Sequence, residues 1–228
     1  MPKIAVVVPA YNAAGTIGEL ISRLSGSVSR ENIFVVDDGS ADQTESIAHD
    51  LGVWVLKHRT NRGKGSALRD GLKKAVELDY ELIVTLDADL QHDPSEIPSF
   101  VEAASHLDIV VGKRSISPRT MPFHRVISNT LTSKMISWRT GSVVDDSQCG
   151  YRLYTARVLK AIDSDCRYFD YESDILLKAA LRGFRIGSVP IKTIYNDSRS
   201  NMRAVDILRF VIVYLKSFKV KSDKDRTS

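Results

Sequence analysis

The chain has 228 residues, of which 43% are hydrophobic and 26% are charged, as expected for one or two ordinary globular domains. Its net charge of +4 suits anionic ligands but is too small to indicate nucleic-acid binding, and no apolar run is long enough to span a bilayer. The two cysteines lack metal-type spacing and favour a reducing compartment, and Met1-Pro2-Lys3 leads directly into an apolar run, so we expect no signal peptide.

The first hundred residues alternate between predicted strands and predicted helices. Apolar runs predict strands over residues 4–8, 33–36, 53–56 and 82–86. A helix is predicted after each strand, with start signals at Thr16 with Glu19 (a capping box), Asp42 with Glu45, the segment before Leu68, and Asp93 with Pro94. This alternation is typical of an α/β fold with a mostly parallel central sheet and helices on both faces.

Beyond residue 107 the alternation is less regular. Strands are predicted over residues 108–111 and 186–191, and helices over residues 126–138, 172–182 and about 204–220. A polar, turn-like segment covers residues 145–152. Because no internal repeat or linker interrupts the chain, we predict one domain over residues 1–221 and a disordered tail over residues 222–228.

Three polar motifs follow predicted strands directly. They are Pro9–Asn12, Asp37–Ser40 and Asp87–Gln91. In open α/β sheets, ligands bind outside the carboxyl ends of the strands, so the three motifs are expected at one edge of the sheet. The sequence therefore predicts a ligand site there. Because Asp38 belongs to such a loop, we expect its removal to weaken ligand binding with little effect on folding.

The third motif carries a candidate metal site. Asp87, Asp89 and Gln91 are alternate residues, which share one face of an extended chain, so their oxygens can converge. Hard oxygen ligands of this kind suit Mg²⁺ or Mn²⁺, held by one or two carboxylates plus substrate phosphates. The alternative is a strand end whose aspartates make turn and cap hydrogen bonds.

Two familiar phosphate motifs are missing. No Gly-x-Gly-x-x-Gly follows the first strand, and Gly63-Lys64-Gly65-Ser66 lacks the spacing of a nucleoside-triphosphate loop. Gly63 and Gly65 either let the backbone approach a ligand, with Lys64 beside it, or form a flexible connection before a helix.

The ordered motifs resemble those of family 2 glycosyltransferases. The matching segments are Val7-Val8-Pro9-Ala10-Tyr11-Asn12, Val36-Asp37-Asp38-Gly39-Ser40, Asn61-Arg62-Gly63-Lys64-Gly65 and Asp87-Ala88-Asp89-Leu90-Gln91-His92. The last segment, followed by a proline, most resembles the branch of dolichol-phosphate mannose synthases and bacterial polyprenyl-phosphate glycosyltransferases. The resemblance covers residues 3 to about 203 and implies a single nucleotide-sugar-binding domain of the glycosyltransferase A type.

The resemblance also implies roles for the matched residues on the donor side. Those that would contact the nucleotide are Pro9, Tyr11, Asn12 and Asp38. Those that would surround the metal and the donor diphosphate are Lys64, Asp87, Ala88, Asp89 and Gln91. Arg199 resembles a residue of a segment that folds over the donor phosphates, although the match around it is poor and Arg203 is a candidate substitute.

Arg114 and Asp146 complete the implied catalytic set with Asp89. Arg114 matches a phosphate-binding position, and Asp146 falls where many members carry an acidic group on the acceptor side. Asp146 or Asp145 is the candidate general base if the acceptor is a sugar hydroxyl. A lipid phosphate is already ionised and needs orientation and charge pairing instead, which the basic segment from Lys113 to Arg139 suits unless it is simply a solvated face.

The implied activity is inverting, metal-dependent transfer of a hexose, in the first instance mannose, from a GDP- or UDP-hexose to a polyprenyl phosphate. One alternative is transfer to a saccharide hydroxyl in cell-surface glycan synthesis. Another is a non-catalytic nucleotide-sugar binder, although the intact Asp87, Asp89 and Gln91 argue against it. Such an enzyme is expected to be cytoplasmic and peripheral on the cytoplasmic face of the membrane.

Two segments could bring the protein to a membrane. One is the basic segment, and the other is the last helix, where apolar residues from Ile207 to Phe218 precede a cluster of lysines. We expect the apolar residues of this helix to pack on the sheet, which leaves the basic segment as the docking surface.

Other polar residues are given structural interpretations. His58, His106 and His124 are expected on the surface or in loops, and Cys149 is expected to be a packed side chain. Glu172 and Asp174 resemble an acidic pair of the family but equally suit the start of a helix.

Overall fold

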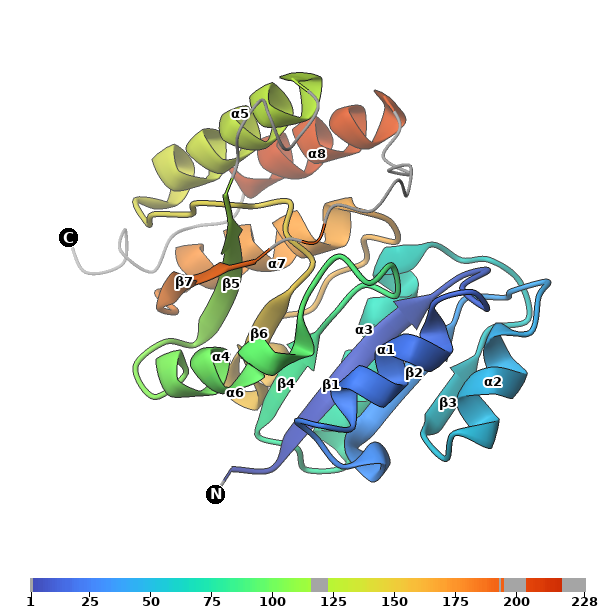
Figure 1. Ribbon diagram of the computed structural model, residues 1–228. Coiled ribbons are helices and arrows are strands. Elements are labelled where there is room, and N and C mark those ends of the chain that lie inside the picture. Colours follow the sequence, from blue (N-terminus) through green and yellow to red (C-terminus); the bar gives the residue numbers. More distant parts are fainter. Residues whose placement is uncertain (1, 116–122, 193, 195–203, 219–228) are drawn as a thin grey trace.

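The computed structural model describes residues 2–115, 123–192, 194 and 204–218. Its centre is a seven-stranded sheet with strand order β3-β2-β1-β4-β6-β5-β7 (Figure 1). The strands are β1 (Ile4–Ala10), β2 (Ile33–Asp37), β3 (Trp54–Lys57), β4 (Leu82–Thr85), β5 (Ile109–Arg114), β6 (Arg152–Thr155) and β7 (Ile186–Ile191).

Six of the strands are parallel to one another and β6 is reversed. β6 pairs antiparallel with both β4 and β5, whereas all other neighbouring strands pair in parallel. β1 lies between β2 and β4, with Ala10 beside Asp37, so the three strands end at the same edge of the sheet. The predicted α/β fold with a mostly parallel sheet is therefore confirmed.

Helices cover both faces of the sheet. In Figure 1, α1 lies in front of β1 and β2, and α3 lies behind them. The helices are α1 (Ile17–Leu24), α2 (Thr44–Asp50), α3 (Lys64–Glu77), α4 (Ile97–Ala103), α5 (Phe123–Thr140), α6 (Ala156–Ala161), α7 (Asp170–Leu181) and α8 (Ala204–Ser217), with short 3₁₀ turns at Arg30–Asn32 and Pro94–Glu96. α3 approaches the sheet closely because of Gly71, where a Cβ atom would lie 2.5 Å from Val7 Cγ1.

Two of the three predicted capping residues stand at the N-cap. Asp93 accepts a hydrogen bond from the Ser95 amide (2.9 Å) at the Pro94–Glu96 turn, as predicted. Thr16 is the N-cap of α1, as predicted, but the capping box does not form, because the Thr16 hydroxyl donates to the Ala13 carbonyl (3.2 Å). Asp42 lies one residue before the N-cap of α2, although its carboxylate still accepts from the Thr44 amide (3.0 Å).

α8 does not pack on the sheet, contrary to our expectation. It packs on α7, which separates it from the strands, and among its described larger apolar side chains it buries Phe210, Val213 and Tyr214 alone. α5 lies beside α8 at the top of Figure 1. Among the described residues no helix is both long and apolar enough to cross a membrane. The predicted tail, residues 222–228, lies outside the described residues.

Candidate functional site

The loops after β1 and β2 are joined to each other at the carboxyl edge of the sheet. The Asn12 amide donates to Ser40 Oγ (2.9 Å), and Asn12 Oδ1 accepts from the Ala41 amide (2.9 Å). Asn12 has φ = +50°, a left-handed conformation that asparagine tolerates better than most residues. Pro9 is buried in β1, whereas the Tyr11 side chain is 52% exposed at this edge.

Asp38 is buried and holds the loop that precedes α3. Its two carboxylate oxygens accept hydrogen bonds from the amides of Arg62 (2.9 Å) and Gly63 (2.8 Å), and His58 Nδ1 lies 2.6 Å from Oδ1. His58 Nε2 lies 3.1 Å from Asp70 Oδ2. His58 lies in a loop, one of its two expected places, but it is not on the surface, because its ring is buried between two carboxylates that lie far apart in the sequence.

One carboxylate oxygen of Asp37 has no hydrogen-bond partner among the described residues, and the sequence did not single out this residue. It is the last residue of β2 and is fully buried. Oδ1 accepts from the Ser40 amide (3.0 Å) and from the Ser40 hydroxyl, whereas the buried Oδ2 has no hydrogen-bond partner among the described residues. Buried hydrogen-bond acceptors are normally paired. An unpaired acceptor at the edge of the sheet where ligands bind is therefore a candidate to accept a hydrogen bond from a ligand.

Lys64 lies between two carboxylates at the start of α3. Its Nζ atom is 2.7 Å from Asp87 Oδ1 and 3.2 Å from Glu172 Oε2. Burial alone lowers the pKa of Lys64, but the charges of Asp87 and Glu172 outweigh burial and raise it. Burial alone raises the pKa of Asp87, and the charge of Lys64 and its hydrogen bond outweigh that effect and lower it.

Asp89 lies beside this ion pair and has the opposite pKa shift. Burial, and after it the charge of Asp87, raise the pKa of Asp89. Asp89 Oδ1 also accepts from the Gln91 amide (3.1 Å). Two neighbouring carboxylates that repel each other are what a divalent cation relieves, so Asp87, Asp89 and Gln91 fit Mg²⁺ or Mn²⁺ by their chemistry. Within the described ranges no group of three or more His, Cys, Asp or Glu side chains could hold a metal.

The glycines around Lys64 make close contact with the chain before α7. A Cβ atom at Gly65 would lie 2.5 Å from the Tyr168 carbonyl oxygen, and one at Gly63 would lie 2.4 Å from the Arg167 carbonyl oxygen. Neither interpretation offered for these glycines describes this contact, because their close approach is to another protein segment. Gly150 has the same role against the metal motif, since a Cβ there would lie 2.5 Å from Asp87 Oδ2.

A fully buried arginine, which the sequence analysis also missed, holds the second half of the site together. The guanidinium of Arg152 donates to the carbonyl oxygens of Cys149 (2.7 Å), Ser147 (2.7 Å) and Glu172 (2.8 Å). It thereby joins β6, the loop before β6 and α7. The same hydrogen bonds of Arg152 place Gly150 and Glu172. These two residues belong to this half of the chain and contact the Lys64–Asp87 pair.

Arg114 and Asp146 form a bidentate ion pair. Arg114 Nε lies 2.7 Å from Asp146 Oδ2, and Nη2 lies 2.9 Å from Oδ1, which also accepts from Asn129 Nδ2 (2.8 Å). Asp146 is fully buried. With both oxygens engaged, Asp146 is placed to hold Arg114 and not to remove a proton. Asp145, the other candidate base, pairs with Lys113 (2.9 Å) and accepts from the Ser188 hydroxyl.

Several predicted positions lie outside what the structure describes. Arg199, Arg203 and Arg119 belong to the residues that it leaves out, and so do the side chains of His124 and Arg125. Ala88 is half-buried between the two aspartates of the metal motif. Cys149 is a buried, packed side chain, as expected.

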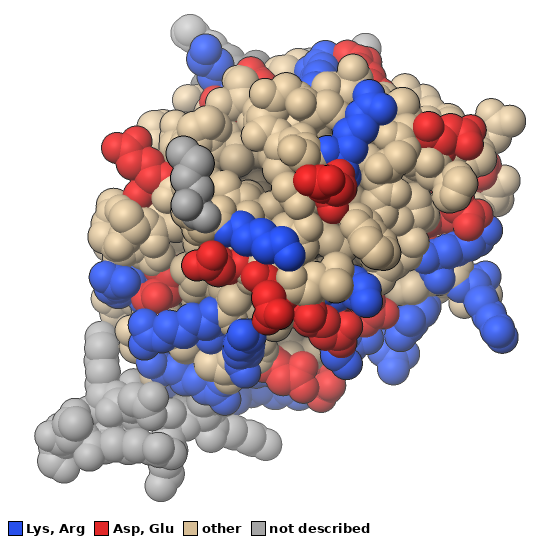
Figure 2. Space-filling view, turned by 90° about the horizontal axis from the view of Figure 1, so that it is seen from below, with Lys and Arg blue, Asp and Glu red and all other residues tan. Residues whose placement is uncertain are grey.

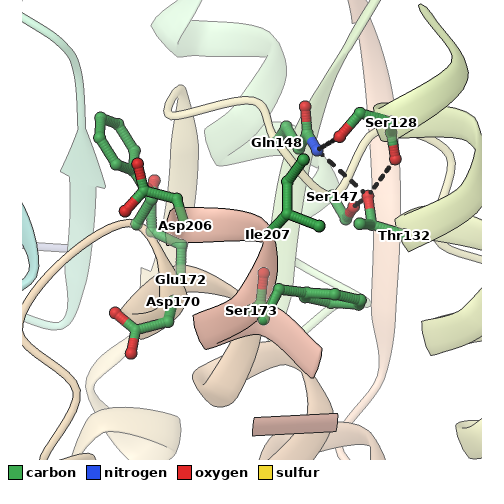
Figure 3. Close-up of a pocket in the computed structure, with 11 residues that line it drawn as sticks. Ser128, Thr132, Ser147, Gln148, Asp170, Glu172, Ser173, Asp206 and Ile207 are labelled. Carbon is green, nitrogen blue, oxygen red and sulfur yellow. Dashed lines mark hydrogen bonds between the residues drawn. The ribbon is translucent and has the colours of Figure 1, made fainter. Parts of the chain in front are cut away.

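A pocket next to this site lies between α5, α7 and α8 (Figure 3). On one side, Gln148 Nε2 donates to Ser128 Oγ (3.0 Å), and the hydroxyls of Thr132 and Ser147 lie 2.9 Å apart. Acidic side chains, among them Glu172, gather on the other side in Figure 3. Glu172 also contacts Lys64, and Lys64 contacts Asp87. These contacts connect the pocket to the metal motif.

Substitution of Asp38 gives a direct test of this geometry. The sequence predicted little effect on folding, whereas the structure predicts a loss of stability. Asp38→Ala should lower the free energy of unfolding by about 2–3 kcal/mol, because two buried amides and His58 lose their acceptor. Asp50→Ala, at an 81% exposed side chain, is the matched control and should change it by less than about 0.5 kcal/mol. Urea unfolding measures both, and equal stabilities would contradict the structural role of Asp38.

Comparisons with known proteins agree with this geometry. The family model for glycosyl transferase family 2 matches residues 5–163. The chain is 32% identical to the UDP-N-acetylglucosamine–dolichyl-phosphate N-acetylglucosaminyltransferase of Methanococcus voltae, over 97% of each chain. It is 31% identical to the undecaprenyl-phosphate mannosyltransferase of Micrococcus luteus, over 83% of this chain and 82% of the relative.

A solved structure shares the fold. It is glucosyl-3-phosphoglycerate synthase from Mycobacterium tuberculosis, in complex with Mn²⁺, UDP and glucosyl-3-phosphoglycerate. The TM-score is 0.74 at 20% identity, and the match covers 96% of this chain and 81% of that chain. With the family match, the sheet topology and the motifs at its carboxyl edge taken together, this chain belongs to glycosyltransferase family 2.

Proposed function

We propose that this glycosyltransferase moves a hexose, in the first instance mannose, from a nucleotide sugar to a polyprenyl phosphate with inversion at the anomeric carbon. The names of the two relatives support a polyprenyl-type acceptor, and that of the Micrococcus luteus relative supports mannose. The bound Mn²⁺ and UDP in the solved neighbour support a divalent cation and a nucleoside-diphosphate donor.

On the donor side, Tyr11 and Asn12 are the exposed residues proposed to contact the nucleotide, while the buried Pro9 and Asp38 support them from below, and we add Asp37, whose Oδ2 has no partner among the described residues. Asp87, Asp89 and Gln91 would hold Mg²⁺ or Mn²⁺, which would stabilise the negative charge of the departing diphosphate. Lys64, Ala88, Arg114 and Arg199 complete the proposed surroundings of that diphosphate.

The acceptor requires no general base in this proposal, which agrees with the contacts of the two candidate bases. A sugar hydroxyl must lose a proton during transfer, whereas a phosphate monoester is already ionised near neutral pH. Asp146 is bonded to Arg114 and Asn129, and Asp145 to Lys113 and Ser188. These engagements favour a phosphate acceptor over the saccharide alternative.

The observation that carries the lipid part of the proposal is an exposed apolar surface on α5 and α8. We call it the α5–α8 surface; its members are Ile127, Leu131 and Trp138 of α5, and Ile207, Leu208, Val211, Ile212, Leu215 and Phe218 of the α8 segment, exposed by 36–76%. An apolar face of this extent on one side of two adjacent helices is uncommon on a monomeric soluble protein and suits burial in a bilayer interface.

The two helices contact each other at their C-terminal ends, and the pocket lies between their N-terminal halves. The rings of Trp138 and Phe218 lie 6.4 Å apart, and Arg139 Nη2 donates to the Ser217 carbonyl (2.8 Å). Ser128 of α5 and Ile207 of α8 line the pocket. Because Ile207 belongs both to the α5–α8 surface and to the pocket lining, a lipid chain on this surface would lie beside the pocket.

Membrane contact by apolar side chains replaces the basic segment as our proposed main docking force. Lys134 and Lys216 are exposed at the edge of the α5–α8 surface and suit anionic headgroups. Figure 2 shows the face seen from below in Figure 1, where Lys and Arg are mixed with Asp and Glu in the lower part of the view and the upper part is mostly uncharged. That face offers no field of one sign, so we place the membrane at the top of Figure 1.

The activity is tested with a panel of GDP- and UDP-hexoses in the presence of Mn²⁺. We expect glycosyl transfer to a polyprenyl phosphate in detergent, detected as a labelled lipid product, and no transfer to soluble saccharides. A polyprenol without its phosphate is the matched control and should be inert. Transfer to saccharides but not to the lipid phosphate would select the alternative acceptor class.

The metal role is tested by Asp89→Asn. The variant keeps the shape of the side chain but loses its charge, so transfer should fall about 10²–10³-fold. Addition of a chelator should abolish transfer by the unaltered chain. Full activity of Asp89→Asn in the presence of the chelator would contradict the metal site.

The α5–α8 surface is tested by flotation with vesicles. Leu208→Ser, Ile212→Ser and Leu215→Ser together should abolish vesicle binding and leave the melting temperature nearly unchanged, because the three side chains are exposed. Trp54→Ser, at the edge strand β3, removes an equally exposed apolar side chain and should leave binding intact. Binding that persists in the triple variant, and disappears at high salt, would restore the basic segment as the docking surface.

A further inference from the structure

Lys64 forms an ion pair with Asp87, one of the residues that we assign to the metal. Its Nζ atom lies 2.7 Å from Asp87 Oδ1, a hydrogen-bonding distance between opposite charges. The other oxygen, Oδ2, packs against Gly150 so closely that a Cβ atom there would lie 2.5 Å away. Oδ1 is also close, at 3.0 Å from such a Cβ atom, so the whole carboxylate of Asp87 is confined between Gly150 and Lys64.

The backbone of Lys64 is fixed, which leaves its side chain to move. Gly63 and Gly65 on either side pack against Arg167 and Tyr168, and the Ser66 amide donates to the Arg167 carbonyl (3.1 Å). The four side-chain carbons of a lysine let its ammonium shift while the backbone stays in place. The side chain is 18% exposed, and the Phe169 ring lies 5.4 Å from its Nζ atom.

Glu172 offers the ammonium a second position. Its Oε2 lies 3.2 Å from Lys64 Nζ, and its Oε1 is buried without a hydrogen-bond partner among the described residues, with Arg152 Nε 3.9 Å away. A buried carboxylate with one unpaired oxygen can accept an additional hydrogen bond. Lys64 can therefore leave Asp87 without losing its charged partner.

We propose that Lys64 and a divalent cation compete for Asp87, and that Glu172 receives the Lys64 ammonium when the cation binds. Glu172 then sets the affinity for the cation without contacting it, and is a positioning residue that acts through Lys64. The inference rests on the proposed function in one respect, the assignment of Asp87 and Asp89 to the metal.

The test is a cycle of Mn²⁺ binding to the full chain without donor or acceptor, measured by the electron paramagnetic resonance signal of free Mn²⁺. Lys64→Met should tighten binding about tenfold, because no ammonium then competes for Asp87. Glu172→Gln should weaken binding about tenfold, because Lys64 is then left with Asp87 as its charged partner. In the Lys64→Met background, Glu172→Gln should have little further effect, because Glu172 acts through Lys64.

Two matched variants control for the change in net charge. Asp174→Asn removes the same charge as Glu172→Gln two residues further along α7, but its carboxylate pairs with Lys178. Lys113→Met removes an ammonium that pairs with Asp145. Both should leave the Mn²⁺ affinity within about twofold, since neither Asp174 nor Lys113 contacts Lys64 or Asp87, and each is paired with another side chain.

The outcomes separate this inference from the proposed function. Equal effects of Glu172→Gln in both backgrounds would mean that Glu172 acts as a distant charge, and would overturn the proposal while leaving the metal site intact. An unchanged affinity in Lys64→Met would do the same. Failure of the unaltered chain to bind Mn²⁺ would overturn the metal assignment and this inference together. If thermal melting shows that Lys64→Met does not fold, the comparison of Glu172→Gln with Asp174→Asn decides, and equal affinities overturn the proposal.

Discussion

The buried guanidinium of Arg152 is the interaction on which the second half of the site depends. A charged side chain removed from water is costly unless its donors are satisfied, and here three backbone carbonyls satisfy them. Those carbonyls belong to the loop before β6 and to α7. These two segments are distant in the sequence, and nothing in the local sequence of either one fixes its position relative to the other. Arg152 therefore fixes where Gly150 lies against Asp87 and where Glu172 lies against Lys64, and through these contacts it joins the second half of the chain to the first.

The first half of the site was largely predictable, because its polar motifs directly follow strands that run in the same direction. β1, β2 and β4 are apolar runs that pair in parallel, and each delivers its polar motif to the same edge. Periodicity and strand ends are local signals, so the sequence predicted where Asn12, Asp38 and Asp87 would meet. It did not predict how Asp38 is used, since the amides of Arg62 and Gly63 and the ring of His58 reach it from a loop that lies 20 to 25 residues further along the chain.

The second half was less predictable, because its structure rests on long-range polar contacts. Nothing adjacent to Arg152 in the sequence indicates that it is buried, and nothing adjacent to Asp146 indicates that Arg114 and Asn129 engage both of its oxygens. The apolar residues of α8 indicated a buried face, but their number exceeds what contact with α7 can cover, so most of them remain exposed. Helical periodicity alone does not show whether an apolar face meets protein or lipid.

The reversed direction of β6 separates the two substrates along the polypeptide. Because β6 is antiparallel to β4, its amino end lies at the carboxyl edge of β4, and the loop that precedes it meets the loop that follows β4. The proposed donor contacts come mainly from residues before 115, whereas the pocket and the α5–α8 surface come from residues after 122. The proposed contacts for donor and acceptor therefore lie in consecutive stretches of chain. During divergence, either stretch could change its ligand independently, provided that the pairs Lys64–Glu172 and Asp87–Gly150 stay matched across the boundary.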